Sequence, residues 1–545
     1  MLVVSTPFST RPSPTLVMTN LDSSLRTLDQ LDNLYAFLLH RPLSDSKAMR
    51  SVAINCPGGL QYTFDDLHRA SGRLANWLLS LGLPKGSRVA AQVEKSPEAV
   101  MLYLATIRAG LVFLPLNTAY RAGEIGYFLE DAKPAVVVCS PENLGWIAPL
   151  AQKAGCRAVE TLGESCDGSL LAKAAPFPDA APIVLTGPDE LAAILYTSGT
   201  TGRSKGAMLS HRNLASNALV LHHAWQWQAG DVLLHALPIF HVHGLFVALH
   251  GALYNSSEMV WLPRFDLDAV IAALPSVTVM MGVPTFYVRL LTDPRFQAGL
   301  VRRTRLFVSG SAPMLTETHE AFTARTGHRI LERYGMSETV MLTTNPYDGE
   351  RRPGTVGHPL PGVDLRLVSA ETQAVIPLPS LGEASAIGGV EVRGPNVFRG
   401  YWNMPEKTKE EFTADGWFKT GDVGRWDELG YLALVGRSKD LIITGGYNVY
   451  PKEIEKLLDD WPGVEESAVF GVPHPDFGEA VTAVVVAKPG AQVETTALMA
   501  SLKGVIANYK VPKQIHLLEA LPRNVMGKVQ KNLLRDQFSR PSGPA

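Results

Sequence analysis

Cysteine is scarce in this chain of 545 residues, and its few positions form no recognisable ligand pattern. The four cysteines are Cys56, Cys139, Cys156 and Cys166. No two of them make a CxxC pair, and the three between 139 and 166 have no histidine at a metal-ligand spacing. The spacing argues against a disulfide framework or a structural zinc site and is typical of a reducing compartment.

The chain also lacks an excess of charge of either sign. Its 50 lysines and arginines nearly balance 52 acids, for a formal net charge of −2. No global basic field is therefore available to recruit nucleic acid or an anionic membrane surface. We expect no nucleic-acid partner, and a local site must bind any anionic ligand.

One long run without charged residues raises the question of a membrane span. Residues Val232 to Ser257 contain no Lys, Arg, Asp or Glu, which on charge count alone permits a span. The run also holds four histidines and Pro238, which are unfavourable in hydrocarbon. Because buried strands and helices of an α/β domain are nearly as apolar, we predict no integral membrane segment.

The first twenty residues lack acids and carry a single arginine, Arg11, among several Ser and Thr. They do not show the repeated arginines of an amphipathic presequence, and nothing resembles a secretory signal. A dispensable tail, or a true start at Met18, explains them as well. We expect a cytoplasmic protein, with the mitochondrial or plastid matrix left open.

Length and hydrophobic patterning predict two domains of α/β type. A single core stops growing near ~250–300 residues, so this chain needs more than one. Helical spacing alternates with strand patterns from residue 62 onward, for example a helix over 64–81 and a strand over 88–93. Such alternation predicts crossover units on mostly parallel sheets flanked by helices. Shorter strands after residue 354 predict a β subdomain, and helices over 451–459 and 498–509 predict a small α+β domain.

The strongest local motif is the segment from Tyr196 to Gly206, YTSGTTGRSKG. A strand pattern ends here in a loop with three glycines, five Ser or Thr hydroxyl side chains and one lysine. Backbone amides in such a loop can form a concave anion site, to which hydroxyls and Lys205 add donors and charge. It is not the Walker pattern, and a flexible loop is the alternative. The density of donors favours phosphate binding.

Four further segments carry candidate site residues, each with a plainer alternative. They are Leu331–Thr339 (LERYGMSET) after Ser309–Pro313 (SGSAP), Gly416–Asp422 (GWFKTGD), Val435–Pro451 (VGRSKDLIITGGYNVYP) and Pro522–Lys528 (PRNVMGK). A ring beside a glycine can stack on a base, and Glu338 could hold Mg²⁺. Asp422 could accept ribose hydroxyls. Alone, each could equally be a turn or a surface charge.

Together and in this order, the motifs resemble the adenylate-forming superfamily of acyl-CoA synthetases, luciferases and peptide-synthetase adenylation domains. The resemblance covers nearly the whole chain and implies ATP, Mg²⁺ and coenzyme A as ligands. It implies a tail at 1–30, an ATP- and acid-binding domain at 31–436, a hinge at 437–440 and a mobile C-terminal domain at 441–545.

The resemblance also implies roles for individual residues. The ATP phosphates would be bound by Thr197, Ser198, Gly199, Thr200, Thr201, Gly202 and Lys205. The rest of the nucleotide pocket would be Gly310, Ser311, Ala312, Glu332, Arg333, Tyr334, Gly335, Met336 and Ser337, with Tyr334 against adenine. Asp422 and Arg437 would bind ribose, Glu338 would hold Mg²⁺, and Gly445 and Gly446 would border the coenzyme A passage. Lys528 would bridge the acid and the α-phosphate, and Lys439 would lie in the hinge.

Several stretches resemble the malonyl-CoA synthetases in particular, among them ALPIFHVHGLF (236–246), MGVPTFYVRLL (281–291) and ERYGMSET (332–339). Malonate keeps a second carboxylate that must be paired when buried. With that resemblance, Arg289 would grip it through two parallel hydrogen bonds, although a solvated helix position is the alternative. His241 and His243 would line the pocket, and a core role for His243 is the alternative.

Other functions stay open at this point. A fatty or aryl acid–CoA ligase would have an apolar pocket without a usable arginine. An adenylation domain would feed a carrier protein, but no carrier segment follows Lys528. A non-catalytic nucleotide-binding relative would be expected to lack Lys205, Glu338 or Lys528. We expect a small dicarboxylic acid and coenzyme A as partners, and a monomer or weak homo-oligomer.

Overall fold

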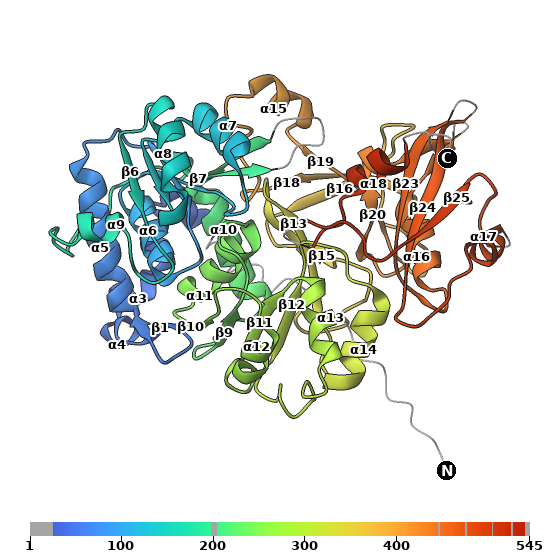
Figure 1. Ribbon diagram of the computed structural model, residues 1–545, viewed down its shortest axis with the longest axis horizontal. Coiled ribbons are helices and arrows are strands. Elements are labelled where there is room, and N and C mark those ends of the chain that lie inside the picture. The colour runs from blue at the N-terminus through green and yellow to red at the C-terminus, as the bar shows by residue number, and fades with distance from the viewer. Residues whose placement is uncertain are drawn as a thin grey trace, which may run out of the picture.

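The computed structural model describes residues 25–197, 204–444, 447–474, 477–503, 505–524 and 527–539. Figure 1 shows a large part and, at one end of the molecule beside β20, a smaller part that contains α16, α17 and α18. Four sheets organise the described chain. The predicted α/β class, with mostly parallel sheets and a smaller C-terminal domain, is confirmed.

The first sheet has six strands in the order β6-β5-β3-β4-β7-β8, and all neighbours are parallel except β7 and β8. The strands are β3 (Arg88–Gln92), β4 (Val112–Pro115), β5 (Val136–Cys139), β6 (Ala158–Thr161), β7 (Leu191–Thr197) and β8 (Lys205–Ser210). Crossover helices join the parallel strands, as the alternating pattern predicts.

The second sheet has nine strands in the order β15-β14-β13-β12-β11-β9-β10-β1-β2. Its six central strands are parallel, and β2, β14 and β15 are antiparallel additions at the two edges. The strands are β1 (Val52–Asn55), β2 (Gln61–Thr63), β9 (Val232–His235), β10 (Glu258–Trp261), β11 (Val279–Gly282), β12 (Leu306–Ser309), β13 (Leu331–Met336), β14 (Val340–Thr344) and β15 (His358–Pro359).

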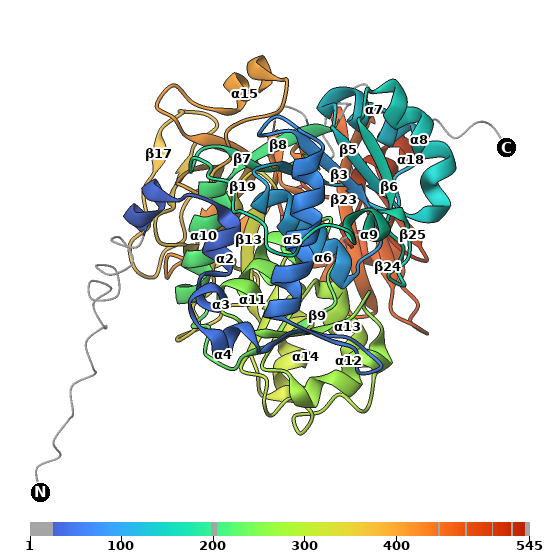
Figure 2. The ribbon, with the colours of Figure 1, turned by 90° about the vertical axis from the view of Figure 1, so that its left-hand side faces the viewer.

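Helices lie between and outside these two sheets. The helices of the large part are η1 (Leu28–Gln30), α2 (Leu34–Leu38), α3 (His40–Ser44), α4 (Ser46–Met49), α5 (Phe64–Ser80), α6 (Pro97–Arg108), α7 (Ala122–Ala132), η2 (Pro141–Asn143), α8 (Leu144–Lys153), α9 (Ser169–Ala174), α10 (His211–Ala224), the π-helix η3 (His243–Leu249), α11 (His250–Tyr254), α12 (Leu267–Ala273), η4 (Leu274–Ser276), α13 (Pro284–Thr292), α14 (Thr316–Thr326) and α15 (Pro405–Glu411). Figure 2 shows α5 and α6 side by side.

The pleat of the strands explains this layering, because successive side chains point to opposite faces. Val89 and Leu233 belong to one core that also holds α6, α10 and η3, so these helices lie between the sheets. Ala90 faces the other way, into a core with α7 and α8, and Leu234 into a core with α12, α13 and α14. The two sheets and their inner helices therefore share one continuous core.

The uncharged run 232–257 folds as β9, η3 and α11 within this interior. Among the described residues, no helix combines the length and apolar character that a membrane span requires. Near the N-terminus, the side chain of Leu28 in η1 is buried in the core. The folded chain therefore begins before residue 31, within the segment predicted as a tail.

Two antiparallel units complete the fold. The third sheet, β17-β16-β18-β19-β20, comprises β16 (Asp364–Val368), β17 (Val375–Ile376), β18 (Gly388–Arg393), β19 (Phe418–Trp426) and β20 (Leu432–Arg437). The fourth, β22-β21-β24-β23 with β25 paired to β24, comprises β21 (Ile442–Thr444), β22 (Tyr447–Val449), β23 (Val464–His474), β24 (Gly478–Ala487) and β25 (Gln514–Leu518). Helices α16 (Pro451–Asp459), α17 (Thr495–Lys503) and α18 (Lys531–Phe538) pack on it.

The short helix η5 (Ser438–Asp440) lies between β20 of the third sheet and β21 of the fourth. The predicted hinge falls on this turn, and the domain boundaries stay a prediction. The fourth sheet has hydrophobic cores of its own, distinct from the shared core of the large part.

Candidate active site

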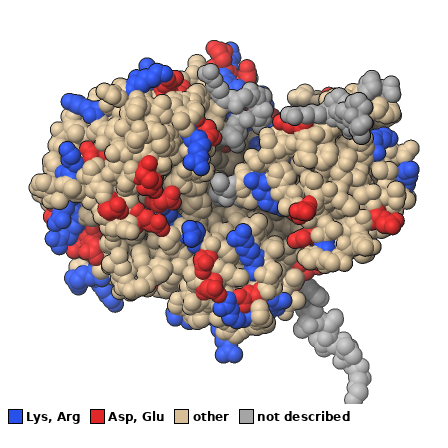
Figure 3. Space-filling model, in the orientation of Figure 1, with Lys and Arg blue, Asp and Glu red and all other residues tan. Residues whose placement is uncertain are grey.

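The candidate site lies where the parallel strands of the second sheet reach their carboxyl ends. The segments that follow β9, β12 and β13 supply His241 and His243, Gly310 and Ser311, and Glu338. In open α/β sheets, ligands bind outside the carboxyl ends of the strands. Figure 3 shows the molecule hollowed between its larger and smaller parts.

The two ends of the predicted phosphate loop are fixed by strand pairing. Thr197 and Lys205 are opposite residues of β7 and β8, and Thr197 Oγ1 donates to the Lys205 carbonyl at 3.4 Å. Lys205, expected in the loop, is therefore the first residue of β8. Its Nζ lies 4.4 Å from the centre of the Tyr401 ring and 3.5 Å from Glu411 Oε1. The remaining predicted loop residues, Ser198, Gly199, Thr200, Thr201 and Gly202, lie outside the described residues.

Glu338 lies in the tight turn between β13 and β14 and is buried. The Tyr401 hydroxyl donates to its Oε1 at 3.0 Å, and the Phe398 amide donates to its carbonyl at 2.8 Å. Burial raises the pKa of Glu338, while hydrogen bonds and the charges of Arg437 and Lys205 oppose the rise. A buried carboxylate near cations, without an ion pair among the described residues, has the chemistry that suits Mg²⁺.

The backbone of this hairpin is constrained around the glutamate. A Cβ on Gly335 would lie 1.8 Å from the Val340 carbonyl oxygen, so only glycine fits. Val340 adopts a φ of +54°, which is rare for a β-branched residue and costs on the order of 1–3 kcal/mol. The Asn396 side chain donates to the carbonyls of Thr339 and Met341, at 2.8 and 3.0 Å, and so holds the chain on both sides of Val340.

The predicted ribose residues lie together beside Tyr334. Asp422 and Arg437 are opposite residues of β19 and β20, and Arg437 Nε lies 2.7 Å from Asp422 Oδ1. The Tyr334 hydroxyl donates to the other carboxylate oxygen of Asp422. Burial, together with the Asp422 carboxylate, raises the pKa of Tyr334. This cluster is satisfied within the protein, and stacking of Tyr334 on adenine stays a prediction.

The small part brings Lys528 to the same region. A Cβ on Gly527 would lie 3.3 Å from Thr285 Cγ2 at the start of α13, so this loop packs on the large part. Lys528 is exposed to solvent at the edge of the site. The surrounding protein atoms that displace part of its water, together with the charge of Arg437, lower its pKa to about 8. Lys528 in turn helps lower the pKa of His241, after burial and Arg333. The lysine from the small part thus lies among the residues that follow β9 and β20.

Lys439, the predicted hinge residue, lies in η5 and is exposed. Partial loss of its hydration to neighbouring protein atoms lowers its pKa. Its neighbour Asp440 forms an ion pair with Arg535 of α18, with a separation of 2.9 Å. Gly445 and Gly446 lie outside the described residues. The hinge role and the coenzyme A passage stay predictions.

Arg333 is a guanidinium buried without a partner. Only 4% of the residue is exposed, and its Nε and Nη2 have no hydrogen-bond partner in the part of the chain that the structure describes. Burial lowers its pKa to about 9. A Cβ on Gly310 would lie 2.3 Å from Nη1 of Arg333, so glycine at this position leaves room for the guanidinium. Sequence patterns assign Arg333 to the nucleotide pocket but cannot reveal this isolation.

The two predicted histidines border the same pocket. His243 Nδ1 lies 3.3 Å from Ser311 Oγ, and His241 Nδ1 accepts from the His243 amide at 3.3 Å. His243 Nε2 and the buried Ser309 hydroxyl have no partner among the described residues. Burial and the charge of Arg333 lower the pKa of both imidazoles, to about 4 for His241, so both are neutral. Ala312, which follows Ser311, is half-buried.

Arg289 lies on the exposed side of α13, with its Cζ 5.9 Å from the centre of the Phe265 ring. It follows Thr285 by four residues and therefore shares the helix face that meets the Lys528 loop. Its predicted contact with the acid stays a prediction.

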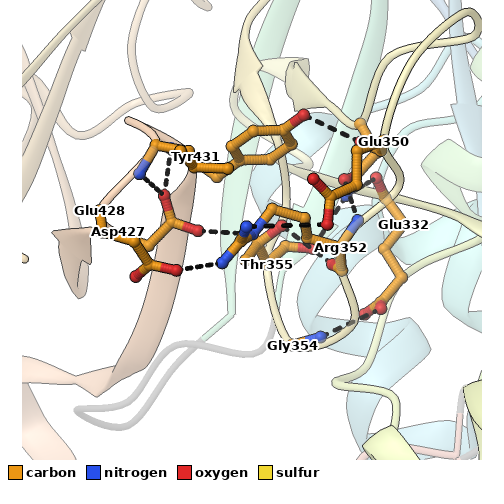
Figure 4. A network of polar contacts seen from close by, with 10 residues as sticks. Glu332, Glu350, Arg352, Gly354, Thr355, Asp427, Glu428 and Tyr431 are labelled. Carbon is orange, nitrogen blue, oxygen red and sulfur yellow. Dashed lines mark hydrogen bonds and ion pairs between the residues drawn. The ribbon is translucent and has the colours of Figure 1, made fainter. Parts of the chain in front are cut away.

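Glu332 supports a loop on the other face of β13. Figure 4 shows its carboxyl group directed to the Gly354 amide, which donates to Oε1 at 3.3 Å. Burial raises the pKa of Glu332 to about 8. In the same network, Arg352 forms ion pairs with Asp427, at 2.9 Å, and with Glu428. These contacts tie the segment between β14 and β15 to the turn between β19 and β20.

Tyr401 is absent from the predicted site although it contacts both Lys205 and Glu338. Its segment, Gly400-Tyr-Trp402, has no phosphate or metal signature in the sequence. The contact arises only because this segment pairs with β8, almost 200 residues away in the sequence. Met336 and Ser337, at the end of β13, are half-buried.

The AMP-binding enzyme family matches residues 44–402, and the AMP-binding enzyme C-terminal domain matches residues 453–528. The chain therefore belongs to the AMP-binding enzyme family. Among curated relatives, the mitochondrial malonate–CoA ligase ACSF3 of Mus musculus is 38% identical over 516 residues, which cover 88% of each chain. The malonate–CoA ligase of Arabidopsis thaliana is 36% identical over 83% of this chain and 78% of its own.

Comparison with solved structures finds similar proteins. The ATP-bound MatB of Rhodopseudomonas palustris superposes with a TM-score of 0.89 at 53% identity, over 93% of this chain and 99% of that chain. The apo form of MatB, with the same identity and coverage, gives a TM-score of 0.80. Because the two MatB structures match the same share of the chain, the overall structure described here superposes better on the ATP-bound form.

Proposed function

We propose that this protein is an AMP-forming acid–CoA ligase and that its acid is malonate. The reaction would convert malonate, ATP and coenzyme A to malonyl-CoA, AMP and diphosphate. Relatives named malonate–CoA ligase and the 53% identity to MatB support the class and the acid. The single observation that carries the acid is the buried, unpartnered guanidinium of Arg333 in the pocket that Lys528 borders.

A second carboxylate fits this pocket for an energetic reason. A buried charge is costly unless it is paired and hydrogen-bonded. The free Nε and Nη2 of Arg333 present two parallel donors, the geometry that binds a carboxylate bidentately. His243 Nε2 and the Ser309 hydroxyl add neutral polar atoms. A fatty or aryl acid would leave the guanidinium unpaired, so a small dicarboxylic acid is favoured.

The first step is attack by the other malonate carboxylate on the α-phosphorus of ATP. A carboxylate is a poor acyl donor, and expulsion of diphosphate gives an acyl-AMP with a good leaving group. The charge of Lys528 would offset the repulsion between the two anions, and Lys205 would bind the phosphates. Glu338 would hold Mg²⁺, which would supply further positive charge at the phosphates.

In the second step the coenzyme A thiol attacks the acyl carbonyl, and AMP leaves. Lys528 has no role in that attack, since no new phosphate bond forms. Movement of the small part about Lys439 would withdraw Lys528 and bring Gly445 and Gly446 to the thiol passage. The position of Lys528 near His241 and the contact of Gly527 with Thr285 are consistent with the first step.

The deciding experiment is a panel of small mono- and dicarboxylic acids, assayed for acid-dependent AMP release and for the CoA thioester. Malonate should give the highest kcat/KM, with methylmalonate and succinate below it. A preference for fatty or aromatic acids would reject malonate while keeping the ligase class. No AMP release with any acid would reject both and favour a non-catalytic nucleotide-binding relative.

Three further assignments belong to this proposal. Mg²⁺ dependence follows from Glu338 and is tested by adding a chelator. A monomer or weak homo-oligomer is tested by light scattering. A cytoplasmic location is tested by fractionation, and its alternative is an organellar matrix, as named for the ACSF3 relatives.

A further inference from the structure

The segment after β18 crosses to the first sheet and pairs with β8. Tyr401 lies opposite Ala207 in an antiparallel bridge, and the Trp402 amide donates to the Gly206 carbonyl at 2.8 Å. Side chains two apart on a strand share a face, so Tyr401 emerges on the face of β8 that carries Lys205. The backbone thus fixes the position of the tyrosine before any ligand binds.

From this position Tyr401 contacts two groups that come from different sheets. Its ring centre lies 4.4 Å from Nζ of Lys205, on the first sheet, and its hydroxyl donates at 3.0 Å to Glu338, on the second. The residue is only 4% exposed, so both contacts are shielded from solvent. We propose that Tyr401 is a positioning residue that sets Lys205 and Glu338 relative to one another for binding of Mg·ATP. The inference rests on the proposed function and deepens it at the nucleotide end of the site.

Each contact has a separate physical effect. The hydrogen bond from the hydroxyl fixes the direction of the Glu338 carboxylate, which is the proposed ligand of Mg²⁺. The electron-rich face of the ring attracts the ammonium group of Lys205. Glu411, 3.5 Å from the same Nζ, holds the lysine from another direction. Tyr401 therefore lies between the lysine and Glu338, and no direct ion pair between them occurs in the described structure.

Two substitutions separate these effects. Tyr401→Phe keeps the ring and removes one oxygen atom, and we expect the Mg²⁺ concentration at half-saturation to rise about tenfold at pH 7. The KM for ATP at saturating Mg²⁺ should change less than about twofold. Tyr401→Leu also removes the ring and should raise the KM for ATP roughly fivefold.

The matched control is Tyr62→Phe. The Tyr62 hydroxyl also donates to a buried glutamate, Glu98 Oε1, at 2.7 Å. Tyr62 lies on β2, at the edge of the nine-stranded sheet opposite to β13. The same chemical change there should leave Mg²⁺ dependence unaltered, which separates positioning from the general loss of a hydrogen bond.

Binding is measured by calorimetric titration of ATP into the full-length protein at several Mg²⁺ concentrations, without acid, alongside thermal unfolding. A double-mutant cycle of Tyr401→Phe with Glu338→Gln should show strong coupling in Mg·ATP affinity. Coupling near zero, or a Tyr401→Phe variant with wild-type Mg²⁺ dependence, overturns the inference. If Tyr401→Leu does not fold, Tyr401→Phe carries the test alone. Normal Tyr401-dependent Mg·ATP binding without AMP release from any acid would sink the proposed function instead.

Discussion

Two arginines near the site, the half-buried Arg437 and the buried Arg333, differ in whether the protein itself supplies a partner. Arg437 pairs with Asp422, which also accepts from Tyr334, so this cluster is complete within the protein. Arg333 has Nε and Nη2 without partners among the described residues. Buried polar groups are normally hydrogen-bonded, and exceptions need an explanation. The Arg437 cluster is complete without a ligand, whereas in the proposed function the acid would supply the partner that Arg333 lacks among the described residues.

Strand β13 serves both clusters because its side chains alternate in direction. Arg333 and Tyr334 are successive residues and therefore point to opposite faces. The same strand thus separates Arg333 from the Asp422 cluster. The difference between the clusters can be tested by removing charges on each side.

The largest effect is expected for Arg333→Met. Loss of a bidentate charged contact should lower kcat/KM for malonate by roughly 10²–10⁴-fold. Turnover of a monocarboxylate such as acetate should persist. Because the unpaired guanidinium is costly to bury, thermal unfolding of the ligand-free variant should occur at the same or a higher temperature.

Arg305→Met provides the matched control for that prediction. Arg305 is also largely buried, but its Nε donates to Asp231 Oδ1 at 2.9 Å. Removing it leaves a buried carboxylate unpaired and should destabilise the protein by about 3 kcal/mol, with kcat/KM per folded molecule unchanged. Equal destabilisation by the two substitutions would mean that Arg333 has a partner in the fold. The proposed difference between Arg333 and the paired arginines would then be wrong.

Lys528→Ala should have the next largest effect. Formation of acyl-AMP should fall by about 10²–10³-fold, as expected when a transition-state charge is removed. Thioester formation from supplied malonyl-AMP should be spared. In the wild type, kcat/KM for adenylation should fall as pH rises through about 8, because Lys528 then loses its proton. Equal loss of both half-reactions would contradict the assigned role.

Glu332→Gln tests a third buried group, an acid that the fold leaves uncharged. Burial raises the folded-state pKa of Glu332 to about 8, so its contribution to stability is present below the unfolded-state value and is lost as pH rises toward 8. The neutral variant keeps an acceptor for the Gly354 amide. It should be more stable than the wild type at pH 8 by a few kcal/mol and similar at pH 4.5, as measured by denaturant unfolding. A pH-independent difference would refute the raised pKa.

Arg289→Ala should affect malonate less than Arg333→Met does. Its side chain is exposed, so solvent and salt screen any interaction with the acid. We expect a rise in KM for malonate below about tenfold, weaker at high ionic strength. A loss as large as that of Arg333→Met would show that Arg289 closes over the bound acid.

The smallest effect is expected at an exposed contact between the two parts of the molecule. Lys488 Nζ lies 3.0 Å from Glu317 Oε1, and both side chains are well exposed. Such pairs contribute about 0–1 kcal/mol, so Lys488→Ala should change adenylation rates less than about threefold. Glu317→Ala should match it, and a much larger change in either variant would assign the pair a role in holding the small part.

The fold could be predicted from the sequence where the hydrophobic periodicity agrees with the residues that begin and end helices. The predicted helix over 64–81 is α5 (Phe64–Ser80), whose Thr63 and Asp66 form a capping box. The predicted helix over 498–509 is wrong in its bounds, since α17 spans Thr495–Lys503. Gly504 follows its last residue, and glycine at that position is a common helix terminator. The apolar residues after Gly504 fit a helical spacing, but the helix ends before them.

The site was predictable in part. Motifs place Lys205, Glu338 and Lys528 near a common centre, because each follows a recognisable strand or turn. The isolation of Arg333 and the bridge through Tyr401 could not be predicted, since both depend on which segments pack together. The spacing of residues in the sequence does not show that Nε and Nη2 of Arg333 lack hydrogen-bond partners among the described residues.

The left-handed backbone of Val340 has a consequence for how this protein is made. Asn396, which secures the carbonyls beside Val340, lies 57 residues after Thr339 and 55 after Met341. A nascent chain that has just completed β14 therefore carries Glu338 on an unsecured turn. Translation must proceed beyond residue 396 before that carboxylate acquires a fixed direction, so nucleotide capture by a growing chain should begin late in synthesis.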